Sequence, residues 1–252
     1  MVKKSLEKLV KGSLVSLGVG IGILGFNKYS SAQCRPFEAD SATVGLWHLD
    51  EGSGDSIYDS SNLGNNGIIF NPHWLSDSFD GHALTFDDER SYVSIDVRDR
   101  LNLEYEVTVE AWVKLHSYNT VREIIGGRTF HFHVEGDKIK VFVPSGLESS
   151  GSLRSNTNLE LERWYYLAAT CDGRTTQLFI NGVLDGAITD PDEISPLDHS
   201  EILYMGRCYW RPLPFPGVID EIRISNIVRD IQPCDPATID QTSWGKIKSL
   251  YR

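Results

Sequence analysis

Apolar and polar residues alternate with a period of two along most of residues 44–226. The clearest case is VTVEAWVKL, residues 107–115: the valines, the alanine and the leucine share one face, and the polar residues with Trp112 share the other. Such alternation predicts a half-buried strand of an antiparallel sheet. By the same pattern we expect further strands at residues 130–134, 139–143, 164–171, 177–180 and 218–225.

Turn signals separate these segments. Asn181-Gly182 predicts a two-residue type I′ hairpin turn, and Asp172-Gly173 ends the strand before it. Turns recur about every 8–12 residues, as in β-sandwiches, and no segment sustains a helical stripe. The pattern predicts one all-β domain over residues 42–230, with a short linker at 33–41 and a tail at 231–252 that forms a short basic helix or stays loose.

The N-terminus has the layout of an export signal. A lysine-rich stretch, residues 1–12, precedes the uncharged apolar run 14–26, and Ser30 and Ala32 occupy positions −3 and −1 of a small-residue cleavage site. The apolar run makes only about 20 Å of helix, against roughly 30 Å of bilayer hydrocarbon. We therefore expect cleavage after Ala32 and a secreted, cell-surface or periplasmic protein without membrane insertion; the alternative is an uncleaved anchor.

Net charge narrows the range of partners. The whole chain carries −11, and the first 32 residues hold five lysines against one glutamate, so the chain after Ala32 carries −15. Such a surface repels phosphate backbones and anionic lipid. Nucleic acid is therefore excluded as an expected partner, whereas divalent cations, neutral sugars and basic proteins remain compatible.

The chain has four cysteines, and an even number in an exported protein favours disulfides. Cys34 and Cys234 flank the expected domain, whereas Cys171 lies at a strand end and Cys208 in a loop before the last strand. Of the three possible pairings we predict Cys34–Cys234 with Cys171–Cys208.

Several segments, taken in order, resemble the laminin-G-like jelly-roll domains of the concanavalin A-like lectin/glucanase superfamily. They include GLWHLDEGSGDSIYDSSNLGNNGII (45–69), VTVEAWVKL (107–115), WYYLAATCDG (164–173), LFINGVLDG (178–186) and GVIDEIRISN (217–226). The resemblance implies a two-sheet antiparallel jelly-roll sandwich with one concave sheet, in which the first and last strands meet. Relatives include sugar-binding modules, adhesion domains and modules attached to hydrolases, so the fold alone leaves the function open.

A structural calcium site is expected where the first and last strands meet. Asp220 shares the parity of Val218, Ile222 and Ile224, and a carboxylate on an apolar face is costly unless it is paired or bound to a metal. At the other end of the domain, Asp50 and Glu51 end the first strand. A loop rich in Gly, Ser, Asp and Asn follows them through Asn66, and it supplies the oxygen ligands that calcium prefers. The predicted ligands are Asp50 and Asp220, with Asn65 or Asn66 supplying another oxygen. The alternative is that Asp220 bonds backbone amides or Arg223.

Aromatic residues in loops are the candidate ligand-binding groups, since flat rings stack on the apolar faces of sugars. Tyr209, Trp210 and Arg211 precede the last strand, His73 and Trp74 are expected in a second loop, and Tyr118 in a third. The alternative for Tyr209 and Trp210 is packing within their own loop. By contrast, Trp47, Trp112 and Trp164 fall in strands and are expected in the core.

An enzymatic function is not favoured. Glycoside hydrolysis needs two carboxyl groups about 5–9 Å apart, but Asp220 and Glu221 are adjacent on a strand and face opposite ways, and Glu110 stands alone on its face. His131 and His133 share a strand face and suit a metal site, a binding surface or simply a solvated face. The leading hypothesis is an exported, non-catalytic module that binds a glycan. The alternatives are a scaffold that binds a cell-surface protein and a glycoside hydrolase.

Overall fold

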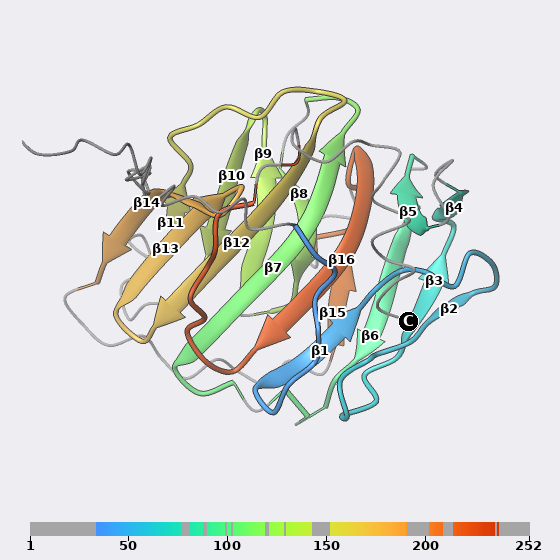
Figure 1. Ribbon diagram of the computed structural model, residues 1–252. Coiled ribbons are helices and arrows are strands. Elements are labelled where there is room, and N and C mark those ends of the chain that lie inside the picture. The colour runs from blue at the N-terminus through green and yellow to red at the C-terminus, as the bar shows by residue number, and fades with distance from the viewer. Residues whose placement is uncertain are drawn as a thin grey trace, which may run out of the picture. The chain divides into compact units, whose positions relative to one another are not determined.

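The computed structural model describes residues 34–76, 81–87, 90–98, 100–101, 103–118, 121–128, 130–142, 152–190, 202–208, 214–234 and 236 (Figure 1). The expected signal, residues 1–32, and nearly all of the tail after residue 234 lie outside this part of the chain. Among the described residues, no helix has the length and apolar character needed to cross a bilayer.

The described residues form two antiparallel sheets of eight strands each, which confirms the expected jelly-roll sandwich. Sheet A has the order β14-β13-β12-β7-β16-β5-β4, and β1 also pairs with β16; sheet B has the order β11-β10-β9-β8-β15-β6-β3-β2. The strands of sheet A are β1 (Thr43–Trp47), β4 (His73–Ser76), β5 (His82–Phe86), β7 (Glu106–Leu115), β12 (Trp164–Asp172), β13 (Thr175–Ile180), β14 (Val183–Thr189) and β16 (Gly217–Ser225). Those of sheet B are β2 (Ser56–Ile57), β3 (Gly67–Phe70), β6 (Tyr92–Asp96), β8 (Arg122–Gly126), β9 (His131–Glu135), β10 (Lys138–Phe142), β11 (Ser152–Arg154) and β15 (Ile202–Met205).

The main core lies between the two sheets. Strand β7 supplies to it the alternate residues that the sequence pattern assigned to one face: Val107, Val109, Ala111, Val113 and Leu115. Every second residue of a strand points to the same side, so this face of β7 packs against sheet B. The expected inner face of the strand is therefore confirmed.

The first and last strands are neighbours, as the resemblance implied. Strand β1 pairs antiparallel with β16, with Trp47 opposite Ile222. The start of β16 pairs with β5 instead, with Ile219 opposite Leu84. Between these two pairings the register of β16 against β7 shifts, and Glu221 adopts a positive φ of 46°. This β-bulge re-aims the acidic residues of the strand, as bulges do in other sheets.

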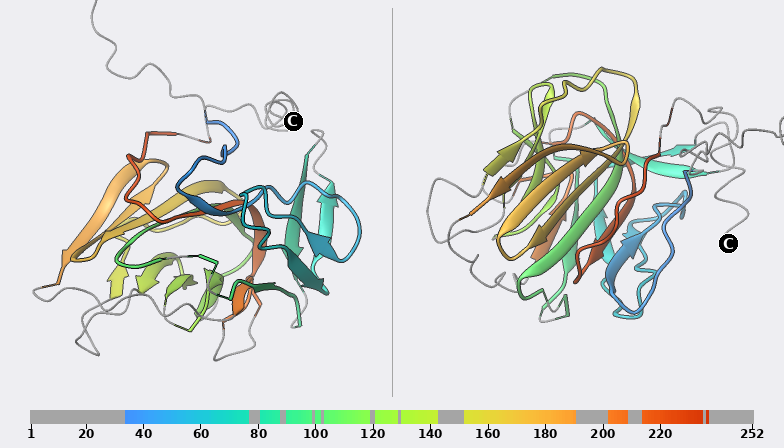
Figure 2. Two further views of the ribbon diagram at one scale, coloured as in Figure 1. Left: turned by 90° about the horizontal axis from the view of Figure 1, so that it is seen from below. Right: turned by 60° about the vertical axis from the view of Figure 1, so that its left-hand side comes forward.

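The outer face of sheet A is covered by both ends of the described chain. Figure 2 shows the N-terminal segment before β1 and the segment after β16 on the side of sheet A away from sheet B. A second apolar cluster lies there, which includes Phe37, Trp112, Tyr166 and Ile231. Strand β7 is consequently buried on both faces, so the prediction that it is half-buried was wrong. The physical reason is that chain outside the strands replaces solvent over its second face.

The two covering segments are joined by the Cys34–Cys234 disulfide, as the sequence predicted. The backbone amide of Cys234 donates to Asn181 O at 2.9 Å in the β13–β14 hairpin. Asn181 and Gly182 both have positive φ, 53° and 73°, as the predicted type I′ turn requires. A side chain at Gly182 would also strike Gln232 O, so glycine serves both the turn and the close approach of the C-terminal segment.

The predicted Cys171–Cys208 disulfide is not formed, and that prediction was wrong. Both residues are buried thiols, but Cys171 lies on β12 of sheet A, and Cys208 follows β15 of sheet B. Facing sheets pack about 10 Å apart, whereas a disulfide spans at most about 7 Å between Cα atoms.

A charged contact also ties the two ends together. The Arg229 guanidinium donates to both carboxylate oxygens of Asp40, at 2.9 and 2.6 Å, and to Thr43 Oγ1 at 3.1 Å. The hydrogen bond from Arg229 is the main reason that the pKa of Asp40 lies well below its usual value. The N-terminal segment is therefore held to the residues after β16 by a covalent bond and by a bidentate ion pair.

Replacing Cys34 and Cys234 together by serine should lower the free energy of unfolding by about 2–5 kcal/mol, because the bond constrains an unfolded chain over a long separation. Denaturant unfolding followed by tryptophan fluorescence measures this loss. Reductant should destabilise the natural protein and leave the double variant unchanged. Equal stability of the two proteins without reductant would contradict the role assigned to the bond.

Asp40→Asn should remove a stabilisation that depends on pH. Because Arg229 holds the pKa of Asp40 below its unfolded value of about 3.9, the pair stabilises the fold above that pH. The stabilisation is lost as the pH falls through the folded-state pKa. Asp40 is half exposed, so solvent screening limits the effect to less than about 1 kcal/mol at neutral pH. Unfolding curves at pH 7 and near pH 2 measure it, with Asp96→Asn, which breaks an exposed pair with Arg98, as the control. The difference should shrink towards the acidic end, and a stability difference as large near pH 2 as at pH 7 would contradict the assignment.

Candidate functional site

A cavity of about 170 Å³ lies between the outer face of sheet A and the two terminal segments. Its sheet side is formed by Glu110 and Trp112 of β7, Tyr166 of β12 and Arg223 of β16. Its rim comes from the terminal segments: Cys34, Arg35, Phe37, Asp230, Gln232, Pro233 and Cys234. The disulfide therefore forms part of the cavity wall.

Three aromatic rings line one side of the cavity. Trp112 stacks on Tyr166 with ring centroids 5.7 Å apart, and Phe37 lies 5.9 Å from Tyr166. The two strand residues are adjacent because Trp112 and Tyr166 are cross-strand partners of β7 and β12. Trp112 was expected in the core between the sheets; it is buried, but in the cluster on the outer face. Of the three tryptophans that were expected in the core, only Trp47 lies between the sheets. Trp164 packs against the apolar cluster on the outer face of sheet A.

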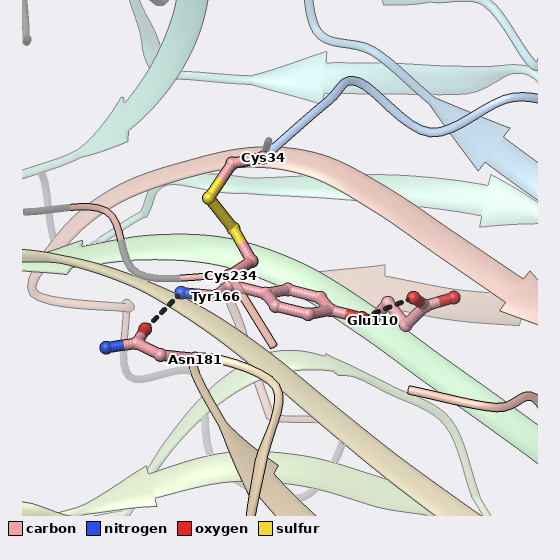
Figure 3. Close-up of a disulfide and its surroundings, with 5 residues drawn as sticks. All are labelled: Cys34, Glu110, Tyr166, Asn181 and Cys234. Carbon is pink, nitrogen blue, oxygen red and sulfur yellow. Dashed lines mark hydrogen bonds between the residues drawn. A yellow bond between two sulfur atoms is a disulfide. The ribbon is translucent and has the colours of Figure 1, made fainter. Parts of the chain in front are cut away.

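A buried ion pair forms the polar part of the cavity. Arg223 donates to both oxygens of Glu110, with Nε–Oε2 and Nη2–Oε1 distances of 2.6 and 2.9 Å. Tyr166 Oη donates to Glu110 Oε1 at 2.7 Å, and its ring reaches from the disulfide towards that carboxylate (Figure 3). Burial, together with the charge of Glu110, raises the pKa of Tyr166, so its hydroxyl stays a donor. The guanidinium also lies over the Phe37 ring at 4.5 Å.

This arrangement combines apolar rings with a compensated charge pair. Buried charges are tolerated when they are paired and hydrogen-bonded, and both oxygens of Glu110 are engaged in this way. The cavity therefore offers flat apolar surface beside polar groups of both signs, which is the usual composition of a small-ligand site. The sequence analysis did not predict the ion pair between Arg223 and Glu110. The two residues lie opposite each other on β16 and β7, and this neighbourhood becomes known only with the strand order of the sheet.

The predicted ligand-binding aromatics do not form this cavity. Tyr209, Trp210 and Arg211 lie outside the described residues. Trp74 and His73 belong to strand β4, not to a loop, because this segment pairs with β5 at the edge of sheet A. Trp74 Nε1 donates to Gly54 O, and Tyr118, which is 46% exposed, donates through its hydroxyl to Leu159 O. Neither Trp74 nor Tyr118 lines the cavity.

The four predicted calcium ligands already have protein partners. Asp50 Oδ1 accepts from His82 N at 3.3 Å, and Asp220 Oδ1 accepts from Glu221 N at 3.0 Å. Asn65 Oδ1 accepts from the Arg100 guanidinium at 2.9 Å, and Asn66 Oδ1 accepts from Asp59 N at 2.9 Å. The contact of Asp220 with the Glu221 amide agrees with the alternative in which Asp220 bonds a backbone amide. Arg223, the other partner considered for Asp220, pairs with Glu110. Calcium ligation stays a prediction, and it requires these oxygens to accept the ion as a further partner.

Two carboxylates that were not among the predicted calcium ligands, Asp59 and Glu221, organise the region around β1 and the start of β3. Asp59 accepts from the backbone amides of Leu46, Ser61 and Asn65 at 2.8–2.9 Å and so shapes the loop between β2 and β3. Glu221 is fully buried, accepts from Phe37 N at 3.2 Å and lies 3.0 Å from His48 Nδ1. Glu221 links β16 to β1 and to the N-terminal segment, and its position at the β-bulge was not visible in the period-two pattern.

A second polar cluster lies on sheet B. Glu123 of β8, His131 of β9 and Cys208 after β15 bring one potential ligand atom each within 4.8 Å of one another. His131 Nδ1 lies 3.0 Å from Glu123 Oε2. Burial raises the pKa of Glu123 and lowers that of His131, and it lowers the pKa of His133 to about 3. The interpretation of His131 and His133 as residues on a solvated face is corrected, because both are largely buried.

Comparison with known proteins agrees with this fold. Residues 87–232, more than half of the chain, match the family model Laminin_G_3, which is described as the concanavalin A-like lectin/glucanases superfamily. No curated protein matches the sequence significantly.

Similar solved structures include binding domains of clostridial toxins. The botulinum neurotoxin serotype G binding domain has a TM-score of 0.59 at 14% identity, covering 83% of this chain and 50% of that one. The binding domain of Paraclostridial Mosquitocidal Protein 1 has a TM-score of 0.56 at 10% identity, with 83% and 52% covered. The serotype D ligand binding domain in complex with N-acetylneuraminic acid has a TM-score of 0.58 at 13% identity, with 75% and 48% covered.

This chain spans about half the length of these toxin domains. At such low identity the likeness concerns the fold, whereas the family model rests on the sequence itself. The chain belongs to the concanavalin A-like lectin/glucanase superfamily.

Proposed function

We propose that this protein is an exported, non-catalytic binding module that takes one sugar residue of a glycan into the cavity on sheet A. The observation that supports this most directly is the wall of Trp112, Tyr166 and Phe37 beside the Glu110–Arg223 pair. Aromatic rings match the apolar face of a pyranose, and nearby polar groups match its hydroxyls.

The size of the cavity favours a single ring. Its volume of about 170 Å³ is below the roughly 300–1,000 Å³ of pockets that bury drug-sized ligands. An extended oligosaccharide would therefore make its other contacts outside the cavity. Arg35, Asp230 and Gln232 on the rim are exposed residues with polar groups that suit hydroxyl recognition.

The similar toxin domains are consistent with this proposal. One similar structure is the receptor binding domain of the botulinum neurotoxin C/D mosaic serotype, and the serotype D domain was solved in complex with N-acetylneuraminic acid. These ligands belong to the toxin domains, whose identity to this chain is only 12–13%. They make receptor glycans a reasonable first ligand class to test.

Binding fits the chemistry of the site better than hydrolysis does. A glycosidase needs one carboxyl group free to donate a proton and a second to act as base or nucleophile. Glu110 instead accepts three hydrogen bonds from Arg223 and Tyr166 at 2.6–2.9 Å. A carboxyl group with both oxygens engaged in this way is poorly placed for proton transfer to a ligand.

Trp112→Phe should weaken glycan binding about tenfold, because it removes part of the stacking surface. A glycan array on the purified protein identifies the ligand, and calorimetry with that glycan measures the change. Gln232→Ala, on the exposed rim, should cost about three- to tenfold through one lost hydrogen bond. Trp74→Phe is the matched control, since Trp74 lies on β4 away from the cavity, and it should bind normally.

Circular dichroism and thermal unfolding confirm that each variant remains folded. Unchanged glycan affinity in both Trp112→Phe and Gln232→Ala would overturn the assignment of the cavity. Failure to bind any glycan while a cell-surface protein is captured would favour the scaffold function. Polysaccharide cleavage that is lost in Glu110→Gln would favour the hydrolase.

Structural calcium is a separate part of the proposal. Calcium at millimolar concentration should raise the thermal midpoint by a few degrees if Asp50 and Asp220 ligate it. Asp50→Asn should abolish the rise, whereas Asp87→Asn, at an exposed position, should keep it. A midpoint that is the same in calcium and in chelator would exclude a stabilising site.

A further inference from the structure

The cluster of Glu123, His131 and Cys208 has the composition of a transition-metal site. Two strands of sheet B and the segment after a third supply it: β8 carries Glu123, β9 begins with His131, and Cys208 lies three residues beyond the end of β15. β8 lies between the other two strands, so the three side chains converge on one place although the residues are up to 85 positions apart in the sequence.

The distances suit a metal after a small adjustment. The three potential ligand atoms lie within 4.8 Å of one another. A tetrahedral ion with bonds of about 2.0–2.3 Å holds its ligands roughly 3.3–3.8 Å apart. Side-chain shifts of about 1 Å would therefore bring sulfur, nitrogen and oxygen to bonding distance.

One oxygen of Glu123 is a buried acceptor without a hydrogen-bond partner. Glu123 is 1% exposed, and its Oε1 has no hydrogen-bond partner. The Phe132 backbone and the Cys208 side chain also hydrogen-bond to this carboxyl group. In its ionised form, which metal binding requires, a carboxylate buried in this way is expensive unless a positive group compensates it. Gly126 faces the same oxygen, and a side chain there would fill the space beside Oε1. Next to the cluster, His133 Nδ1 is also buried without a partner.

We propose that Glu123, His131 and Cys208 bind one Zn²⁺ ion, with the fourth position open to water or to a ligand. Thiolate and imidazole select zinc over calcium or magnesium, which prefer oxygen ligands. Three protein ligands with an open fourth position are typical of reactive or exchangeable zinc sites, whereas structural sites have four. The ion would tie the end of β15 to the β8–β9 hairpin, immediately before the aromatic segment that begins at Tyr209 in the sequence.

This site is independent of the cavity on sheet A. None of its three residues lines that cavity, and its ligands differ from those expected for calcium. It also gives Cys208 a role that does not require a disulfide. The other buried thiol, Cys171, lies in the core between the sheets and supplies a matched control.

Cobalt is the most informative probe, because Co²⁺ replaces Zn²⁺ and shows a charge-transfer band when a thiolate binds it. We expect the chelator-treated, purified protein to bind one Co²⁺ per chain with this band, and one equivalent of Zn²⁺ to remove it. Cys208→Ser should lose the band entirely. His131→Asn and Glu123→Gln should bind Co²⁺ at least tenfold more weakly, and Cys171→Ser should bind as the natural protein does.

A measurement on the natural protein guards against variants that fail to fold. Zn²⁺ should slow alkylation of Cys208 by a thiol reagent, read by peptide mass spectrometry, whereas Ca²⁺ should not. The proposal is overturned if no stoichiometric metal binds, if Cys208→Ser keeps the cobalt–thiolate band, or if Zn²⁺ leaves the alkylation rate of Cys208 unchanged. Either result leaves the glycan proposal standing, since that is tested at Trp112 and Gln232.

Discussion

The arrangement of the described domain depends on the covering of the outer face of sheet A by its two ends. An ordinary sandwich buries one face of each sheet and leaves the other to water. Here the N-terminal segment and the segment after β16 lie across the outer face, joined by the Cys34–Cys234 disulfide (Figure 3). The covered strip is where β7 carries Glu110 and Trp112, so the covering creates the cavity. Without it, the aromatic and charged residues of β7 would be ordinary surface groups.

Because the outer face of sheet A is covered, its charged and polar residues are shielded from water and must pair or hydrogen-bond with one another. Glu110 is paired with Arg223 in a bidentate contact, and Glu221 holds the Phe37 amide and lies beside His48. Buried charges of this kind contribute little net stability against apolar replacements, but breaking one partner is costly. They fix how the terminal segments sit on the sheet, and thereby the shape of the cavity. The same physical demand, applied to Glu123 on sheet B, is the reason for expecting a metal there.

The two candidate sites use the sandwich in different ways. The cavity on sheet A is built from strands plus terminal segments, and its aromatic wall is a surface for recognition. The cluster on sheet B is built from β8, β9 and the thiol that follows β15, and its chemistry suits a bound cation. That two sites of such different chemistry occur on one sandwich agrees with a fold whose members share an architecture but differ in function.

Much of the fold followed from local patterns. The alternation in residues 107–115 placed β7 and its inner face correctly, and Asn181-Gly182 placed the β13–β14 hairpin, because both depend only on neighbours in the chain. The flanking positions of Cys34 and Cys234 also led to the right disulfide. The prediction for Cys171 and Cys208 was wrong because it counted thiols without knowing that they lie in different sheets. Trp74 was assigned to a loop because a four-residue edge strand shows too little alternation to be distinguished.

The sequence by itself determined the strands, their turns and the class of sandwich, since side-chain period and turn geometry are local properties. Only the tertiary structure decided which face is exposed and which residues meet. Arg223 and Glu110 are 113 positions apart and touch because β16 lies beside β7. Glu123, His131 and Cys208 converge because β8 lies between β9 and β15. Strand order is a non-local property set by packing of the whole chain, and that is why both candidate sites became visible only in the folded molecule.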